Sequence, residues 1–179
     1  MSFVFIVLVM NCLFIFSFKR WLGPIGIFIS SLSSLMFSFF YTLVIYNYTT
    51  LSGSIVYFDF GKWFSLVDFI DSHLLFIVDS LSLLTLLVIL LLSIFAQYFG
   101  SEYMYREAFT SRLLYLLNMF ITSVVFLFIV FDFFLVLIVW ELIGLFSLLL
   151  VNYYSTRVYT LKAALKTFIL SRLSDLFIF

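Results

Sequence analysis

Charged side chains occur inside two long apolar segments near the end of the chain. Glu141 lies near the middle of residues 133–151, a run that is otherwise apolar apart from Gly144 and Ser147. Because about 20 helical residues cross the hydrocarbon of a bilayer, we expect this carboxylate near the membrane centre. A carboxylate there costs about 2.5–3.5 kcal/mol on insertion scales, so Glu141 is a candidate functional group.

Four further charges follow in residues 160–179, namely Lys162, Lys166, Arg172 and Asp175. Arg172 and Asp175 are three residues apart, which places them on one helix face and predicts an ion pair. Lys162 and Lys166 share a different face, rotated by about 120° on a regular helix. All four are expected to face protein or trapped water rather than lipid.

Buried carboxylates, cations and ordered water are the components of a proton-transfer path. Protons move between groups whose pKa values are brought close by burial and by neighbouring charge. Glu141 is the natural proton-loading group, and a nearby cation would set its proton occupancy. Structural alternatives stay open for all of these residues. Arg172 and Asp175 could form an ion pair that only holds helices together, and Lys162 and Lys166 could extend their side chains to the membrane interface. Glu141 could be a buried carboxylate whose hydrogen bonds are satisfied and which has no further role.

Composition assigns the chain to the integral membrane proteins. It is 66% hydrophobic and 10% charged, with a mean hydropathy of +1.30, which leaves too little polar surface for a soluble domain. One cysteine and one histidine exclude a zinc or iron–sulfur site built by this chain alone. A net charge of zero provides no basic surface for nucleic acid. The predicted fold class is all-α, as one polytopic transmembrane domain over residues 1–179.

Six membrane-spanning helices are predicted, over residues 3–18, 25–46, 76–99, 113–131, 133–151 and 160–179. Gly23 and Pro24 predict a turn between the first two. The one long polar connection is 47–73, on the predicted outer side. Within it, residues 54–60 alternate as a short strand does, and residues 63–69 fit a second strand or an interfacial helix.

Basic residues predict the orientation of the helices. The connections after the first, third and fifth spans hold Lys19, Arg20, Arg106, Arg112, Arg157 and Lys162, with Lys166 one turn further in. The opposite connections hold Lys62 against Asp59, Asp68, Asp71, Asp79 and Asp132. Both termini are therefore predicted on the outer side of the membrane.

Several short motifs follow one another in a fixed order from Asp79 to Asp175. They are Asp79-Ser80-Leu81-Ser82, Ser101-Glu102-Tyr103-Met104, Trp140-Glu141-x-x-Gly144-Leu145-x-Ser147, Lys162-Ala163-Ala164-Leu165-Lys166 and Ser171-Arg172-Leu173-Ser174-Asp175. In this order they resemble the signature of the subunit 5 family of NADH dehydrogenase, the antiporter-like subunits of respiratory complex I. Leu142, Ser171 and Ser174 depart from the glycine, asparagine and glycine of the family pattern, whereas the charged positions are kept.

The resemblance implies an antiporter-like helical bundle in the mitochondrial inner membrane, with its termini on the intermembrane-space side. Glu141 would be the fifth-helix glutamate of a proton half-channel, Lys166 the sixth-helix lysine, and Arg172 with Asp175 the supporting pair. The chain would be a non-redox subunit of a proton-translocating NADH:ubiquinone oxidoreductase. It would bind no cofactor, since NADH, FMN, iron–sulfur clusters and ubiquinone would belong to other complex I subunits.

Members of this family are much longer than this chain, so the resemblance also predicts an N-terminal part of a split subunit. A second chain would complete it and supply the lysine partner of Glu141, and other membrane-arm subunits and lipids would surround both. Two further interpretations stay open. One is a subunit of a multisubunit cation/proton antiporter, which shares these motifs, and the other is a non-conducting structural anchor. The abundance of Phe and Tyr favours a mitochondrial protein over a subunit of a bacterial antiporter.

Overall fold

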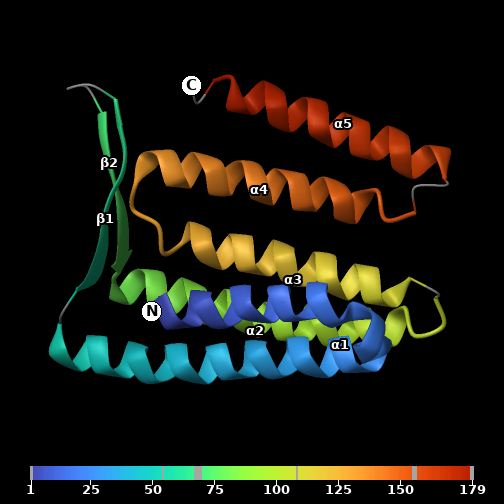
Figure 1. Ribbon diagram of the computed structural model, residues 1–179, viewed down its shortest axis with the longest axis horizontal. Coiled ribbons are helices and arrows are strands. Elements are labelled where there is room, and N and C mark those ends of the chain that lie inside the picture. The colour runs from blue at the N-terminus through green and yellow to red at the C-terminus, as the bar shows by residue number, and fades with distance from the viewer. Residues whose placement is uncertain (1, 54, 67–69, 108, 155–156, 178–179) are drawn as a thin grey trace.

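The computed structural model describes residues 2–53, 55–66, 70–107, 109–154 and 157–177 as a bundle of antiparallel helices with a β-hairpin at one end (Figure 1). The elements are α1 (Ser2–Ser52), β1 (Val56–Leu66), β2 (Ile70–Val78), α2 (Ser80–Tyr103), α3 (Thr110–Leu127), α4 (Phe133–Val151) and α5 (Val158–Asp175). The predicted bundle of long apolar helices is confirmed, and the hairpin is a local departure from the all-α class.

Helix α1 turns back on itself at Gly23, so that its two halves lie antiparallel (Figure 1). Gly23 has φ 60° and ψ −179°, a combination that essentially only glycine adopts. Pro24 follows at the start of the second half, where its missing N–H leaves no helical hydrogen bond unmade. The turn predicted at this dipeptide is therefore present.

Replacing Gly23 with Ala is expected to lower the free energy of unfolding by about 1 kcal/mol, at the low end of about 1–3 kcal/mol for such a backbone conformation. An added Cβ meets nothing within 4 Å, so the cost is backbone strain alone. The matched control is Gly144→Ala, inside α4, where the new Cβ also meets nothing within 4 Å. Ala favours a helix over Gly by about 0.5–1 kcal/mol, so this control should be neutral or stabilising. Equal thermal unfolding midpoints of the two variants in detergent would contradict the strain assigned to Gly23.

The polar connection predicted over 47–73 is shorter and more regular than expected. Helix α1 continues to Ser52, and β1 then pairs antiparallel with β2 from Val56 opposite Val78 to Leu66 opposite Ile70. The alternation over 54–60 therefore indicated a strand correctly. For residues 63–66 the helical alternative is wrong. They are extended, but they continue β1 through Gly61 and Lys62 instead of forming the predicted second strand. Asp68, with residues 67 and 69, lies outside the described residues.

The third span begins later than predicted. Residues 76–78 belong to β2, where Phe76 also bridges to Val130, and α2 starts at Ser80. Asp79 caps this start: its carboxylate accepts from the backbone N–H of Ser80, and the Ser82 hydroxyl accepts from the N–H of Asp79. Asp79 is therefore a capping residue rather than a freely solvated charge.

In the described part of the chain, four helical stretches are long and apolar enough to cross a bilayer: Trp21–Ser52, Ser80–Tyr103, Thr110–Leu127 and Phe133–Val151. Phe3–Lys19 is a shorter apolar helix. Helix α5 carries four charges and is not among the four stretches, although it runs alongside α4 (Figure 1). For the first and last of the six predicted spans, crossing the membrane stays a prediction, and residues 178 and 179 lie outside the described part.

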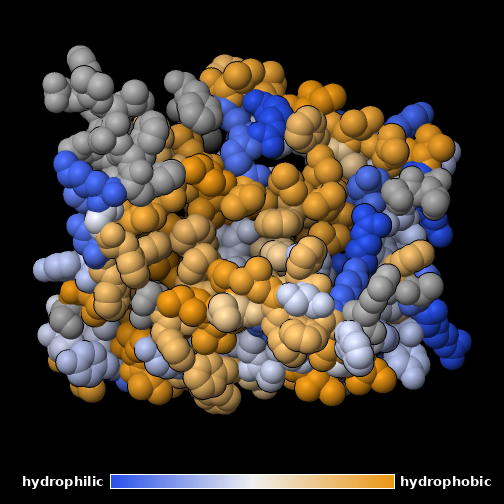
Figure 2. Space-filling model, viewed as in Figure 1, coloured by the Kyte–Doolittle hydropathy of each residue, from blue (hydrophilic) through white to orange (hydrophobic). Residues whose placement is uncertain are grey.

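The buried core lies among α1, α2 and α3. It contains Val4, Leu8, Leu35, Val78, Leu83, Leu86, Leu90, Ile121, Val125 and Ile129. Helices α4 and α5 lie toward the other edge of the bundle and expose large apolar side chains such as Ile138, Leu145 and Ile169. Apolar side chains also cover most of the middle of the face in Figure 2, whereas polar ones gather toward its two ends. This surface suits contact with lipid or with other membrane subunits.

The two ends of the bundle differ in what they carry. The hairpin and both ends of the described chain lie together, and the turn of α1, the α2–α3 connection and the α4–α5 connection lie at the opposite end (Figure 1). The second end holds Lys19, Arg106, Arg112 and Arg157, as the charge pattern predicted. Which membrane face each end adopts stays a prediction.

Candidate functional site

The charged side chains of α4 and α5 meet between the two helices. An Arg172 N–H of α5 donates to Glu141 Oε2 of α4, and the two form an ion pair. The same Arg172 nitrogen, Nη1, lies 3.8 Å from Asp175 Oδ2, so the predicted ion pair within α5 is present. One guanidinium is thus shared by two carboxylates from different helices. The contact with Glu141 within this chain was not predicted.

Trp140 adds a second connection between the helices. Its indole Nε1 donates to Asp175 Oδ1 at 3.1 Å, so both oxygens of Asp175 face a donor. Asp175 is 8% exposed, which makes it the most buried member of the cluster. Sequence reasoning missed this role of Trp140. The available signal was its position beside Glu141, far from the membrane interfaces where Trp usually gathers.

Arg172 makes one further contact and leaves one donor unused. Its guanidinium carbon lies 5.0 Å from the centre of the Phe168 ring, within range of a cation–π interaction. Its Nε is buried and has no hydrogen-bond partner among the described residues. Since an unsatisfied buried donor costs about 1–3 kcal/mol, a water molecule or a group of another chain is expected to accept from it.

Local interactions at the helix ends fix how α4 and α5 present these groups. The Asp132 carboxylate accepts from the Phe134 N–H and caps the start of α4, which places Glu141 near the middle of that helix. Thr160 in the first turn of α5 donates to the Tyr154 carbonyl and ties α5 to the connection that precedes it. Because α5 runs antiparallel to α4, its last turn lies beside the middle of α4 (Figure 1).

Three of the four predicted site residues are brought together and one is not. Lys166 lies on α5 six residues before Arg172, and its side chain is exposed. It forms no ion pair within the described part of the chain. Lys162 is also exposed on the same helix. The proton-transfer role of Lys166 stays a prediction.

The chemistry of the cluster follows from the fixed charge of Arg172. A guanidinium keeps its proton in proteins, so the proton that can be exchanged must reside on Glu141 or Asp175. With both carboxylates ionised the three groups carry a net charge of minus one, and one bound proton makes them neutral. The arrangement can therefore store a proton inside the bundle. Among the described residues, no group of three or more His, Cys, Asp or Glu side chains is placed to hold a metal ion.

The part of the chain that contains this cluster matches a known family. Residues 130–179 match the family model described as the transmembrane part of NADH:quinone oxidoreductase and Mrp antiporters. The chain is also 28% identical to NADH-ubiquinone oxidoreductase chain 5 of Paramecium tetraurelia, in an alignment over 97% of this chain and 30% of the relative. The chain is related to the antiporter-like subunit 5 family.

Other relatives of the subunit 5 family agree. NADH-quinone oxidoreductase subunit L of Buchnera aphidicola is 33% identical over 91% of this chain and 26% of its own length. NADH-ubiquinone oxidoreductase chain 5 of Nyctotherus ovalis is 39% identical over 101 residues, which are 56% of this chain and 6% of the relative. The chain thus spans less than a third of the length of these relatives. The resemblance drawn from the motifs is confirmed.

Proposed function

We propose that this chain is a non-redox, membrane-arm part of a proton-translocating NADH:ubiquinone oxidoreductase, in which Glu141 takes up and releases a proton. The observation that carries the proposal is the ion pair that joins Glu141, the one charged residue of the apolar helix α4, to Arg172 of α5. A charged cluster of this kind within membrane helices is costly and typically functional. The printed names of the relatives, all NADH oxidoreductase chains, support the assignment to that complex.

The two carboxylates have different tasks in this proposal. Asp175 is buried and held by Trp140, so it fixes the position of Arg172. The Glu141 side chain is 34% exposed in this chain and therefore accessible to a second cation. When the second cation approaches, it would stabilise the ionised form of Glu141 and favour release of its proton. When that cation withdraws, Arg172 alone would compensate the charge of Glu141, and proton uptake would become easier. Redox energy released in other subunits would drive that movement.

The proposal places the complex in the mitochondrial inner membrane, with both termini toward the intermembrane space. Other membrane-arm subunits would cover the exposed apolar faces of α4 and α5. NADH, FMN, iron–sulfur clusters and ubiquinone would be bound by other subunits. A second chain that completes subunit 5 and supplies the cation facing Glu141 stays a prediction of the family resemblance, as does a relay through Lys166.

Replacing Glu141 with Gln in the assembled complex is expected to lower the number of protons translocated per electron. Gln has the same size and still accepts a hydrogen bond from Arg172, so assembly should persist, but it exchanges no proton. Proton uptake into vesicles during NADH oxidation measures the effect. The matched control is Glu107→Gln, an exposed carboxylate outside the cluster, which should leave the ratio unchanged. An intact complex with unchanged pumping in both variants would establish a structural anchor instead.

The second candidate, a subunit of a cation/proton antiporter, is favoured by the description of the matching family model, which includes Mrp antiporters. The two candidates differ in their energy source. An antiporter subunit exchanges sodium or potassium for protons along an imposed ion gradient and without NADH. Gradient-driven exchange that is insensitive to NADH, and that is lost in Glu141→Gln, would favour this candidate.

A further inference from the structure

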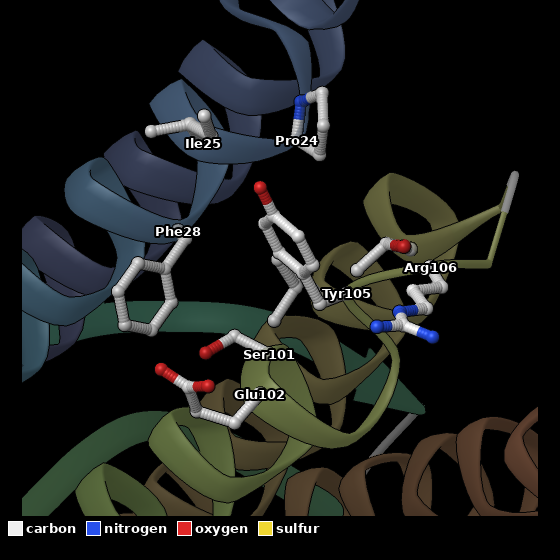
Figure 3. A pocket seen from close by; sticks show the side chains of 9 residues that line it. Pro24, Ile25, Phe28, Ser101, Glu102, Tyr105 and Arg106 are labelled. Atoms are coloured by element: carbon white, nitrogen blue, oxygen red, sulfur yellow. The ribbon is translucent and has the colours of Figure 1, made fainter.

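A pocket of about 600 Å³ lies at the end of the bundle opposite the hairpin, away from the Glu141 cluster. It is formed where the second half of α1 begins, between that half and the end of α2, the α2–α3 connection and the start of α3. One wall is apolar and consists of Pro24, Ile25, Phe28 and Leu114. Figure 3 shows Pro24, Ile25 and Phe28 along α1, with the ring of Tyr105 rising toward Pro24 and Phe28 from the connection.

The opposite wall carries one acid and one base. Glu102 lies on the Phe28 side of the pocket and Arg106 on the other, with the ring of Tyr105 between them in this view (Figure 3). Ser101 adds a hydroxyl. Both charged side chains are exposed, and neither is ion-paired with another described residue. The charges that line the pocket therefore sum to zero, and Glu102 and Arg106 form no ion pair with each other.

The position of the pocket fits the boundary between hydrocarbon and lipid headgroups. Exposed aromatic residues that typically mark such a boundary gather at this end of the bundle, namely Trp21, Tyr103, Tyr105 and Phe109. The apolar wall belongs to helices that enter the hydrocarbon. The charged wall belongs to the polar end of α2, which carries Glu102, and to the connection after it, which carries Arg106. A ligand that fills the pocket must combine an apolar body with a polar end.

We propose that this pocket binds phosphatidylethanolamine, with the lipid phosphate at Arg106 and the lipid ammonium at Glu102. Arginine is well suited to a phosphate, and a carboxylate accepts hydrogen bonds from a primary ammonium. The glycerol and the first acyl carbons would contact Pro24, Ile25 and Leu114. This site is independent of proton transfer at Glu141.

The paired charges discriminate against the other common phospholipids. An anionic lipid is attracted by Arg106, but it is repelled by Glu102 and leaves that carboxylate without a partner. Phosphatidylcholine carries the same net charge as phosphatidylethanolamine, but its quaternary ammonium has no N–H to donate to Glu102. The primary amine is therefore the feature that the pocket would select.

Lipid retention by the purified complex that contains this chain tests the proposal. The delipidated complex is incubated with phosphatidylethanolamine, phosphatidylcholine or phosphatidylglycerol of identical acyl chains, and the retained lipid is measured by mass spectrometry. We expect phosphatidylethanolamine to be retained about tenfold better than either of the others, which is the low end for one hydrogen bond to a charged group. Equal retention of the ethanolamine and choline lipids, or preference for phosphatidylglycerol, would overturn the proposal.

Variants then locate the site. Glu102→Gln should remove the preference for the primary amine, and Arg106→Gln should weaken retention of all three lipids. The matched controls are Glu107→Gln in the connection and Arg112→Gln in the first turn of α3. Both positions are exposed and lie outside the pocket lining, so both variants should retain the preference. If the preference for phosphatidylethanolamine survives in Glu102→Gln, the lipid binds elsewhere. The same conclusion follows if another subunit of the assembled complex fills the pocket.

Discussion

Replacing Arg172 with Met is expected to lower the free energy of unfolding by about 3 kcal/mol, because removing one partner of a buried ion pair costs about 3–5 kcal/mol. The low end of this range applies, since the Glu141 and Arg172 side chains are 34% and 39% exposed in this chain. The substitution leaves Glu141 and Asp175 without the cation that lies between them. Met keeps much of the apolar length of the arginine, so the loss reports mainly on charge.

A double-variant cycle separates charge compensation from packing. Adding Glu141→Gln to Arg172→Met removes one uncompensated charge and should recover about 1 kcal/mol, within the range of about 0.5–3 kcal/mol for directly contacting residues. Arg172→Lys retains a cation without the planar guanidinium and should lose less than Arg172→Met. Denaturant unfolding in detergent micelles compares the original chain with Arg172→Met, Glu141→Gln, the double variant and Arg172→Lys. Strictly additive losses for Arg172→Met and Glu141→Gln would show that the ion pair contributes nothing to stability.

The sequence predicted the part of this site that is local to one helix. Arg172 and Asp175 are three residues apart, and a regular helix alone brings such residues together. The contacts of Glu141 with Arg172 and of Trp140 with Asp175 join residues 31 and 35 positions apart. They depend on how α4 is rotated against α5. Hydrophobic periodicity does not determine that rotation, because α4 is apolar on nearly every face and the charges of α5 lie on more than one face.

The hairpin shows a similar limit. Residues 54–60 alternate with period two, which is a strand signal, but residues 74–78 are continuously apolar and fit the start of a helix as well as a buried strand. Pairing with β1 and the bridge between Phe76 and Val130 decide between the two. Both involve partners distant in sequence. The capping box at Asp79 was the local sign that the helix starts after this segment.

Replacing Asn118 with Leu is expected to lower the free energy of unfolding by about 3 kcal/mol, at the upper end of about 1–3 kcal/mol for an unsatisfied buried group. Gln97 of α2 and Asn118 of α3 are 0% and 2% exposed, and Gln97 Nε2 donates to Asn118 Oδ1 at 2.7 Å. Gln97 Oε1 already has no described partner, so the substitution leaves the whole Gln97 amide unpaired. The matched control, Asn47→Leu on an exposed position of α1, should change stability little.

The double variant Gln97→Met with Asn118→Leu tests the cause of that loss. Met and Leu have about the shape of the residues they replace, and exchanging both partners of a buried hydrogen bond for apolar groups is nearly neutral. We therefore expect the double variant to be more stable than Asn118→Leu alone, because no amide is left without a partner. If it is less stable, the two amides have a polar partner besides each other, and a water molecule bridging Gln97 Oε1 and Asn118 Nδ2 is the simplest group that satisfies both atoms.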